Sequence, residues 1–153
     1  MMHPNTFARL CAAIAIAIAV PGAARAAPAA APVPTIGQLE RVAAFHGPMP
    51  TGVTVAGGGR IFVNFPRWGD DVPYTVAEIR DGRPVPYPDA AINRADPGDP
   101  ARGLESVQSV VADGQGRLWI LDTAAPGFAA PRPGGAKLMA VDLKTDKVVR
   151  TVV

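Results

Sequence analysis

Cysteine and histidine are scarce in this sequence, and the few that occur lie where they support little chemistry. Of the 153 residues, one is cysteine and two are histidine. Cys11 lies in an N-terminal segment that we expect to be removed, which leaves no thiol for disulfides or catalysis. His46 is then the one remaining histidine, and no HxH, HxxxH or HxxE pattern surrounds it. A loop histidine is favoured over a ligand, so neither a metal nor another cofactor is expected.

Several catalytic and binding motifs are also missing. The sequence contains no GxSxG elbow, no P-loop, no GxGxxG fingerprint and no His/Cys set with metal spacing. The sequence therefore indicates no catalytic residue, and it leaves open whether the protein is an enzyme. An excess of one charge is lacking as well: residues 1–26 hold two of the 15 Lys and Arg residues, so 13 basic residues face 13 acidic ones after them. Nucleic acid and anionic membrane surfaces are not expected as partners.

Residues 1–26 have the pattern of a secretory signal peptide. A basic residue precedes an apolar run at 10–20, and a small-x-small cleavage site ends at Ala26. The apolar run is too short to span a bilayer. We expect cleavage before Ala27 and a mature protein outside the cytoplasm, in the periplasm or the extracellular space, with no membrane attachment. Residues 27–37 are rich in Ala and Pro and predict a disordered lead-in.

A repeat organises the rest of the chain. The stretch GVTVAGGGRIFVNFPRW at 52–68 returns as SVVADGQGRLWILDT at 109–123, with Arg60 in register with Arg117, an offset of 57 residues (117 − 60). Each copy predicts a β-hairpin, because two apolar strands flank a glycine-rich turn. One hairpin cannot bury both faces, so the repeat indicates stacked units, either propeller blades or solenoid coils. The length of the period favours the propeller, since a four-stranded blade takes roughly 40 to 50 residues.

The expected fold is therefore an all-β propeller with about two blades in this chain. The first blade and its crossover are expected at 38–104, and a second, incomplete blade at 105–153. Residues 38–45 begin the ordered part, as a helical turn or as an edge strand. Trp119 lies between two apolar residues of a strand and is predicted to be buried, whereas Trp68 follows a proline in a loop and is predicted to be more exposed.

The loop after the first hairpin carries the best candidates for ligand binding. Arg67 and Trp68 stand side by side there, and a guanidinium beside an indole suits a planar or carboxylate-bearing molecule. The structural alternative, which we favour, is that Trp68 covers the blade and that Arg67 pairs with Asp70 or Asp71. Gln108, just before the second copy, and Asp122, near its end, complete the candidate set at a propeller channel.

Three stretches together resemble the yellow / major royal jelly protein family in its bacterial form. They are GRIFVNFPRWGDDVPYTVAEI at 59–79, SVQSVVADGQGRLWILDT at 106–123 and PGGAKLMAVDLKTDKVVRTV at 133–152. The resemblance covers nearly everything after Gln38. It implies a secreted six-bladed β-propeller, distantly related to gluconolactonase-type propellers. It also implies dopachrome conversion, a lactonase-like activity or the binding of small aromatic amines.

The chain departs from that family in two respects. It holds about two of six blades, so most channel-lining residues are absent, and Gly116 precedes Arg117 where insect members place cysteines. No catalytic residue of the family can be assigned, and the gluconolactonase metal set of Glu, Asn and Asp is not recognisable.

Three functions follow from these observations. The chain is a propeller that binds or converts a small aromatic or sugar-acid molecule, a structural or interaction propeller without chemistry, or a non-functional fragment. Three copies with two blades each could close a six-bladed ring as a homotrimer. The sequence favours truncation instead, because it stops inside a strand and its two blades differ in their loops.

Overall fold

The computed structural model describes residues 36–153. The predicted signal peptide at 1–26, the cleavage site before Ala27 and most of the 27–37 lead-in lie outside the described residues. The chain divides into two units at Gln38, and every element below belongs to the second, Leu39–Val153. Within residues 36–153, none of the helical segments is long and apolar enough to cross a bilayer.

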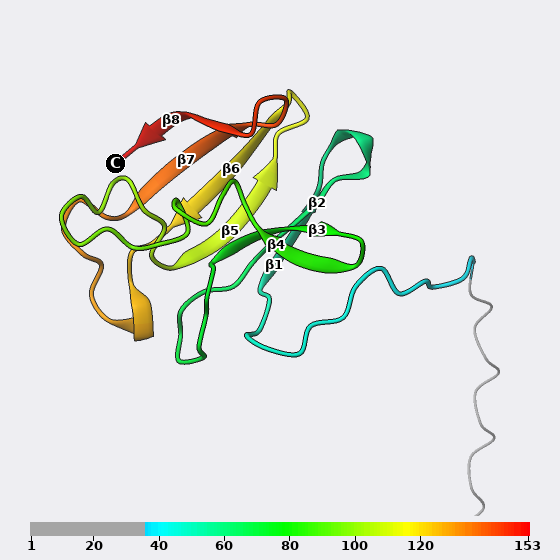
Figure 1. Ribbon diagram of the computed structural model, residues 1–153, viewed down its shortest axis with the longest axis horizontal. Helices are drawn as coiled ribbons and strands as arrows, with labels where there is room; N and C mark the ends of the chain where they lie inside the picture. Colours follow the sequence, from blue (N-terminus) through cyan, green and yellow to red (C-terminus); the bar gives the residue numbers. More distant parts are fainter. Residues whose placement is uncertain (1–35) are drawn as a thin grey trace, which may run out of the picture. The chain divides into compact units, whose positions relative to one another are not determined.

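Eight strands in two antiparallel sheets build the second unit (Figure 1). The strands are β1 (Gly52–Val55), β2 (Ile61–Asn64), β3 (Val76–Arg80), β4 (Arg83–Pro86), β5 (Val107–Ala112), β6 (Arg117–Asp122), β7 (Lys137–Asp142) and β8 (Lys147–Val152), with short 3-10 turns at η1 (Gly57–Gly59) and η2 (Pro126–Phe128). Sheet 1 has the order β1-β2-β3-β4, and sheet 2 has the order β5-β6-β7-β8. Within each sheet every strand pairs with the next one along the chain, as in a propeller blade. The expected all-β fold with about two blades is confirmed, and residues 38–45 contain neither helix nor strand.

The connections divide between the two ends of the sheets. Because successive strands are antiparallel, short turns alternate with long loops, and all the long loops emerge at the same end (Figure 1). We call this the loop end, and its segments are 65–75, 87–106 and 123–136. The opposite, turn end carries 56–60, 81–82, 113–116 and 143–146. Side chains for a binding site therefore gather at the loop end.

One apolar core joins the two sheets. Alternate residues of each strand point to opposite faces, so half of the apolar side chains of each sheet face the other sheet. The members of this core are Phe62, Val76, Tyr87, Leu104, Val107, Val110, Leu118, Ile120, Met139 and Val141. The rings of Phe62 and Tyr87 lie 4.7 Å apart at their centroids. The opposite face of sheet 1 holds a smaller cluster of Val63, Phe65, Val72 and Ala77, against which Phe45 packs.

Arg60 connects the sheets at the turn end. It donates to Glu78 of sheet 1, at 2.6 Å from Nε to Oε1, and to two acceptors of sheet 2, the carbonyl of Leu143 at 2.6 Å and Asp146 at 3.0 Å. Hydrogen bonding to Glu78 holds the pKa of Arg60 above its usual value, against the effect of burial. Burial tends to raise the pKa of Glu78, but hydrogen bonds from Arg60 and Arg80 outweigh it, so that pKa lies below its usual value. The contact between the blades is therefore ionic as well as apolar.

The two tryptophans differ less in burial than the sequence predicted. Trp119 is half-buried, like Trp68, so the prediction that it would be buried is wrong. Leu118 and Ile120 point into the core between the sheets, and strand alternation places Trp119 on the other face of sheet 2. There its indole N–H donates to Asp113 at 3.1 Å, and the Arg117 guanidinium lies 5.8 Å from the centroid of its ring.

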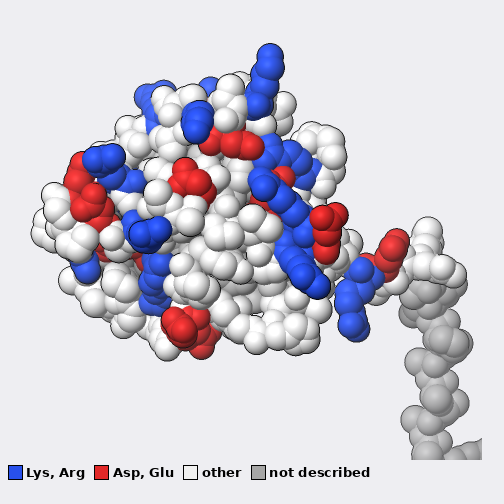
Figure 2. Space-filling model, viewed as in Figure 1, with Lys and Arg blue, Asp and Glu red and all other residues white. Residues whose placement is uncertain are grey.

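Charges of both signs cover the surface of the unit. On the face drawn in Figure 2, Lys and Arg side chains are interspersed with Asp and Glu side chains. This mixture agrees with the balanced composition of residues 27–153.

Candidate functional site at the loop end

Arg67 ties the three loops of the loop end together. Its guanidinium donates to four backbone carbonyls, those of Val72, Leu104, Glu105 and Asn93. These acceptors lie in the loops 65–75 and 87–106. The third loop, 123–136, is joined to Arg67 through the main chain, because Gly127 N donates to the Arg67 carbonyl at 2.7 Å. Burial lowers the pKa of Arg67, and the charges of Asp122 and Glu105 partly offset that effect.

The structure therefore gives Arg67 a positioning role. The favoured structural alternative named Asp70 or Asp71 as its partner, but the acceptors are backbone carbonyls, and Asp70 accepts from Met49 N at 3.2 Å instead. Four of the five guanidinium N–H groups are engaged, so little of this side chain is left for a ligand.

Asp122 lies in a buried polar cluster at the end of β6. Its carboxylate accepts from the backbone N–H groups of Glu105, Ser106 and Ala124 at 2.7 to 2.9 Å. Lys137, at the start of β7, completes the cluster at 2.9 Å, and neither side chain of this pair is exposed. Lys137 also donates to the carbonyls of Pro100 and Gly135, which gives its ammonium three acceptors. Both charges are satisfied, and the pair anchors the loops to sheet 2.

Glu105 is the least satisfied polar group at the loop end. Its side chain is 1% exposed, and its carboxylate forms an ion pair with Arg132, at 3.2 Å from Oε2 to Nε. Neither carboxylate oxygen accepts a hydrogen bond from the described residues. Buried carboxylates normally accept several hydrogen bonds, so this group retains capacity to accept more.

Trp68 forms an aromatic stack with Phe128 from the neighbouring loop. The ring centroids lie 5.1 Å apart with an interplanar angle of 24°. Phe128 is 72% exposed. Trp68 also lines a hollow of about 210 Å³ together with Met49, Pro66, Gly69 and Asp70. The hollow therefore combines an aromatic wall with one carboxylate.

Gln108 lies apart from these groups. It is half-buried in β5, at the point where the pairing with β6 shifts register between Val107 and Ser109. Of the four candidates, Arg67 and Asp122 are brought together through their shared contacts to the Glu105 backbone, and Trp68 follows Arg67 on the same loop.

Sequence reasoning missed Glu105, Phe128, Arg132 and Lys137. Lys137 carried a usable signal, because it is a lone charge at the start of the apolar strand AKLMAVDL. The other three lie in irregular loops, where no periodicity predicts which side chains meet.

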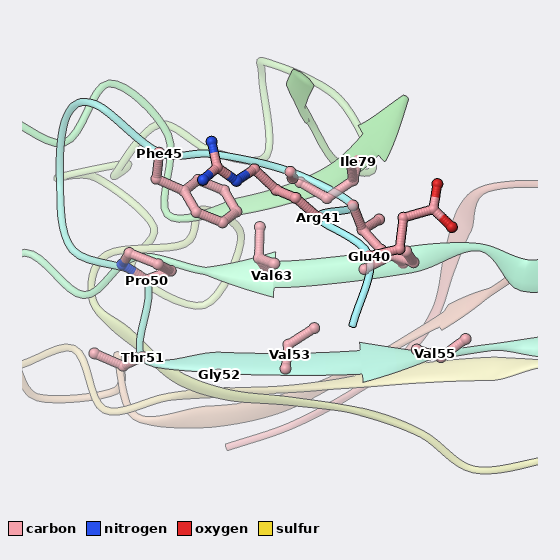
Figure 3. Close-up of a pocket in the computed structure, with 13 residues that line it drawn as sticks. Glu40, Arg41, Phe45, Pro50, Thr51, Gly52, Val53, Val55, Val63 and Ile79 are labelled. Carbon is pink, nitrogen blue, oxygen red and sulfur yellow. The ribbon is translucent and has the colours of Figure 1, made fainter. Parts of the chain in front are cut away.

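A further cavity lies against a face of sheet 1 and not among the three long loops. A groove of about 660 Å³ runs between residues 40–45 and the face of sheet 1 that looks away from sheet 2 (Figure 3). Its wall is mostly apolar, with Val53, Val55 and Val63 on the sheet side and Arg41 and Phe45 on the other. Within residues 36–153, no group of three or more His, Cys, Asp or Glu residues is placed to hold a metal ion.

Comparison with known proteins supports the resemblance found in the sequence. Residues 105–153 match the family described as Major royal jelly protein. The chain is 36% identical over 105 residues to Protein yellow of Drosophila erecta. This match covers 63% of the present chain and 19% of that protein. It is also 36% identical over 102 residues to Protein yellow of Drosophila melanogaster, and that match covers 61% of this chain and 18% of the relative. The chain thus spans under a fifth of the length of these curated relatives.

Proposed function

Because this chain is related to the yellow / major royal jelly protein family, we propose that it belongs to a secreted β-propeller that binds a small aromatic molecule at its loop end. Two sheets of propeller type and the family match support the architecture. The signal-peptide pattern of residues 1–26 supports secretion. N-terminal sequencing of exported protein tests that part, with Ala27 expected as the first residue and an intact Met1 as the contrary result.

The aromatic wall at Trp68 is the observation that carries the binding proposal. One face of the Trp68 ring is stacked against Phe128, and Trp68 also borders the 210 Å³ hollow. That volume suits a single substituted ring, since drug-sized ligands occupy about 300 Å³ or more. Asp70 lies at the same hollow and is exposed, so it can pair with a cationic substituent. A phenol or indole carrying an ammonium group fits both features.

The surrounding contacts support binding more than conversion. Arg67 fixes the loop that carries Trp68 through its four carbonyl contacts, which lowers the entropic cost of ordering the site around a ligand. Asp122 is held by Lys137 and three backbone N–H groups, which leaves it unsuited to proton transfer. We therefore assign no catalytic residue.

Tryptophan fluorescence can test the binding site directly. The Trp119→Phe variant leaves Trp68 as the single tryptophan, so its emission reports on the hollow. Tyramine should quench it saturably, and p-cresol, which lacks the ammonium group, should bind more weakly. Asp70→Asn should weaken tyramine binding by up to about fivefold, the change that about 1 kcal/mol produces.

Asp71→Asn is the matched control, because Asp71 is the exposed neighbour of Asp70 and does not line the hollow. It should leave tyramine affinity unchanged. Quenching that does not saturate, or an equal loss of affinity in both variants, would rule out this site.

A further inference from the structure

Glu105 contacts three other segments of the loop end with three different groups. Its carbonyl accepts from Arg67, its N–H donates to Asp122 Oδ2 at 2.7 Å, and its carboxylate forms the ion pair with Arg132. Arg67 and Arg132 lie in the two other long loops, and Asp122 ends β6. The two main-chain contacts need no particular side chain at position 105, so the buried carboxylate requires a reason of its own.

Stability does not supply that reason. The Glu105 side chain is 1% exposed, its one cationic partner Arg132 is 46% exposed, and neither carboxylate oxygen accepts a hydrogen bond from the described residues. Removing a carboxylate from water is unfavourable unless several hydrogen bonds and a close cation replace its hydration. An apolar side chain of similar size should therefore be tolerated here at least as well.

The loop that Arg132 closes has a strained backbone. Arg132 N donates to the Ala124 carbonyl at 3.0 Å, which makes a closed loop of the residues between them. Within it Phe128 has a φ of 59°, and Ala124 at its start has a φ of 50°. Residues with a Cβ rarely adopt this left-handed conformation, and it persists only where surrounding contacts hold it. The loop that carries Phe128 therefore depends on its anchors.

Two contacts anchor this loop to its neighbours. Gly127 N donates to the Arg67 carbonyl at 2.7 Å, so the residues directly before the two stacked rings are joined to each other. Arg132 provides the second contact through its ion pair with Glu105. Each of the two stacked rings is thus placed relative to Glu105 through an arginine of its own loop.

We propose that Glu105 is a positioning residue of the aromatic site. Its carboxylate holds Arg132, and through Arg132 it holds the loop that sets Phe128 against Trp68. A Trp68 ring supported in this way is already oriented before a ligand enters the hollow, which lowers the entropic cost of binding. The effect on ligand affinity rests on the proposed function, whereas the effect on the stacked rings does not.

Acrylamide quenching of the unliganded protein tests the effect on the rings. In the Trp119→Phe background, Trp68 is the single tryptophan, and Phe128→Ala gives the quenching of a Trp68 ring without its cover. Glu105→Met should raise the quenching from the parent value toward that of Phe128→Ala, because the loop loses an anchor. Quenching equal to that of the parent would overturn the proposal.

A purely structural role is separated from this one by comparing two variants. Arg132→Met leaves the Glu105 carboxylate buried without a cation, so it should lower the urea midpoint of unfolding as well as raise the quenching of Trp68. Glu105→Met should raise the quenching by a similar amount and keep the parent midpoint or exceed it. A Glu105→Met protein that is less stable than the parent but has unchanged quenching would contradict the positioning role.

Two further arginine variants serve as controls in the same assay. Arg132→Lys keeps a cation at position 132 and should restore most of the parent quenching. Arg102→Met removes an exposed arginine of the 87–106 loop that takes no part in this contact, and it should match the parent. A rise in quenching in Arg102→Met equal to that in Arg132→Met would mean that the effect is not specific to the ion pair.

Tyramine binding tests the consequence for the ligand site. Glu105→Met and Arg132→Met should each bind tyramine about two- to tenfold more weakly, the change expected when one side chain has to be ordered on binding. Unchanged affinity in variants whose stack is loosened would overturn the positioning role. If tyramine does not bind the parent saturably, the proposed function fails, and the acrylamide result still decides whether Glu105 holds the stacked rings.

Discussion

Asp146, in the β7–β8 turn of sheet 2, accepts hydrogen bonds from Arg60 and Tyr87 of sheet 1. Arg60 directly precedes β2, and Tyr87 directly follows β4. The Arg60 Nη2 to Asp146 Oδ1 distance is 3.0 Å, and the Tyr87 hydroxyl lies 2.8 Å from the same oxygen. The Arg60 guanidinium also lies over the Phe62 and Tyr87 rings, with its central carbon 5.1 and 5.4 Å from their centroids. The contact between the two sheets at the turn end therefore depends on several side chains that all lie around the Asp146 carboxylate.

Arg60→Met should destabilise the protein by about 1 to 3 kcal/mol. The substitution removes the donor shared by two carboxylates, Glu78 and Asp146, and by the Leu143 carbonyl. It leaves Glu78, whose side chain is 8% exposed, without this partner. Urea unfolding followed by circular dichroism measures the loss. Arg80→Met is the control, because Arg80 also pairs with Glu78 but is 51% exposed, and it should cost under about 1 kcal/mol. Equal losses would mean that the contact to sheet 2 contributes nothing.

Stability should fall at high pH because of Tyr87. Burial, and then the hydrogen bond to Asp146, raise the pKa of this phenol above its usual value of about 10. A group whose pKa is raised on folding contributes stability below its unfolded pKa and loses that contribution as the pH rises through the folded value. Unfolding free energy should therefore decline above about pH 10 in the native protein and decline less in Tyr87→Phe. An unchanged slope in Tyr87→Phe would contradict this assignment.

Lys137→Met should cost about 3 to 5 kcal/mol, because it leaves the Asp122 carboxylate buried without its cation. The double variant Lys137→Met, Asp122→Asn should recover part of this loss, since it removes the unpaired charge. Thermal unfolding of both variants measures the difference. Lys144→Met is the control at an exposed turn position and should stay within about 0.5 kcal/mol of the parent. A double variant less stable than Lys137→Met would show that the unpaired charge of Asp122 is not what destabilises the Lys137→Met protein.

Gly103→Ala should destabilise the 87–106 loop by about 1 to 3 kcal/mol. A Cβ at this position would collide with the Arg94 carbonyl and lie 2.9 Å from Asp96 N, and both are backbone atoms that cannot rotate away. Gly57→Ala is the matched control, because nothing lies within 4 Å of a Cβ there and its φ is not positive. Chemical denaturation should separate the two variants, and a neutral Gly103→Ala would require that the loop rearranges freely.

The strands could be predicted from the sequence because their residues repeat in register. Arg60 and Arg117, aligned by the offset, do occupy equivalent positions, and the all-β fold follows from the two hairpins. The predicted burial of Trp119 was wrong because an apolar strand with both faces partly covered shows no alternation of apolar and polar residues. The sequence therefore did not indicate that Leu118 and Ile120, and not Trp119, face the core.

The candidate site was only partly predictable. Arg67 and Trp68 were found because they are adjacent in a long loop, but their partners are distant in sequence. Arg67 reaches Glu105 across 38 residues, and Trp68 meets Phe128 from another loop. Contacts of this kind depend on how three loops pack, which no local pattern encodes.

The separation of long loops from short turns also bears on how such a chain can change over evolutionary time. Insertions in 65–75, 87–106 or 123–136 lengthen segments that emerge at one end, so they alter recognition without disturbing strand pairing. Insertions in the short turns would instead displace groups such as Asp146, on which the contact between the two sheets depends. Diversification is thereby confined to one end of the scaffold, as in antibody variable domains, while the other end conserves the spacing from sheet to sheet.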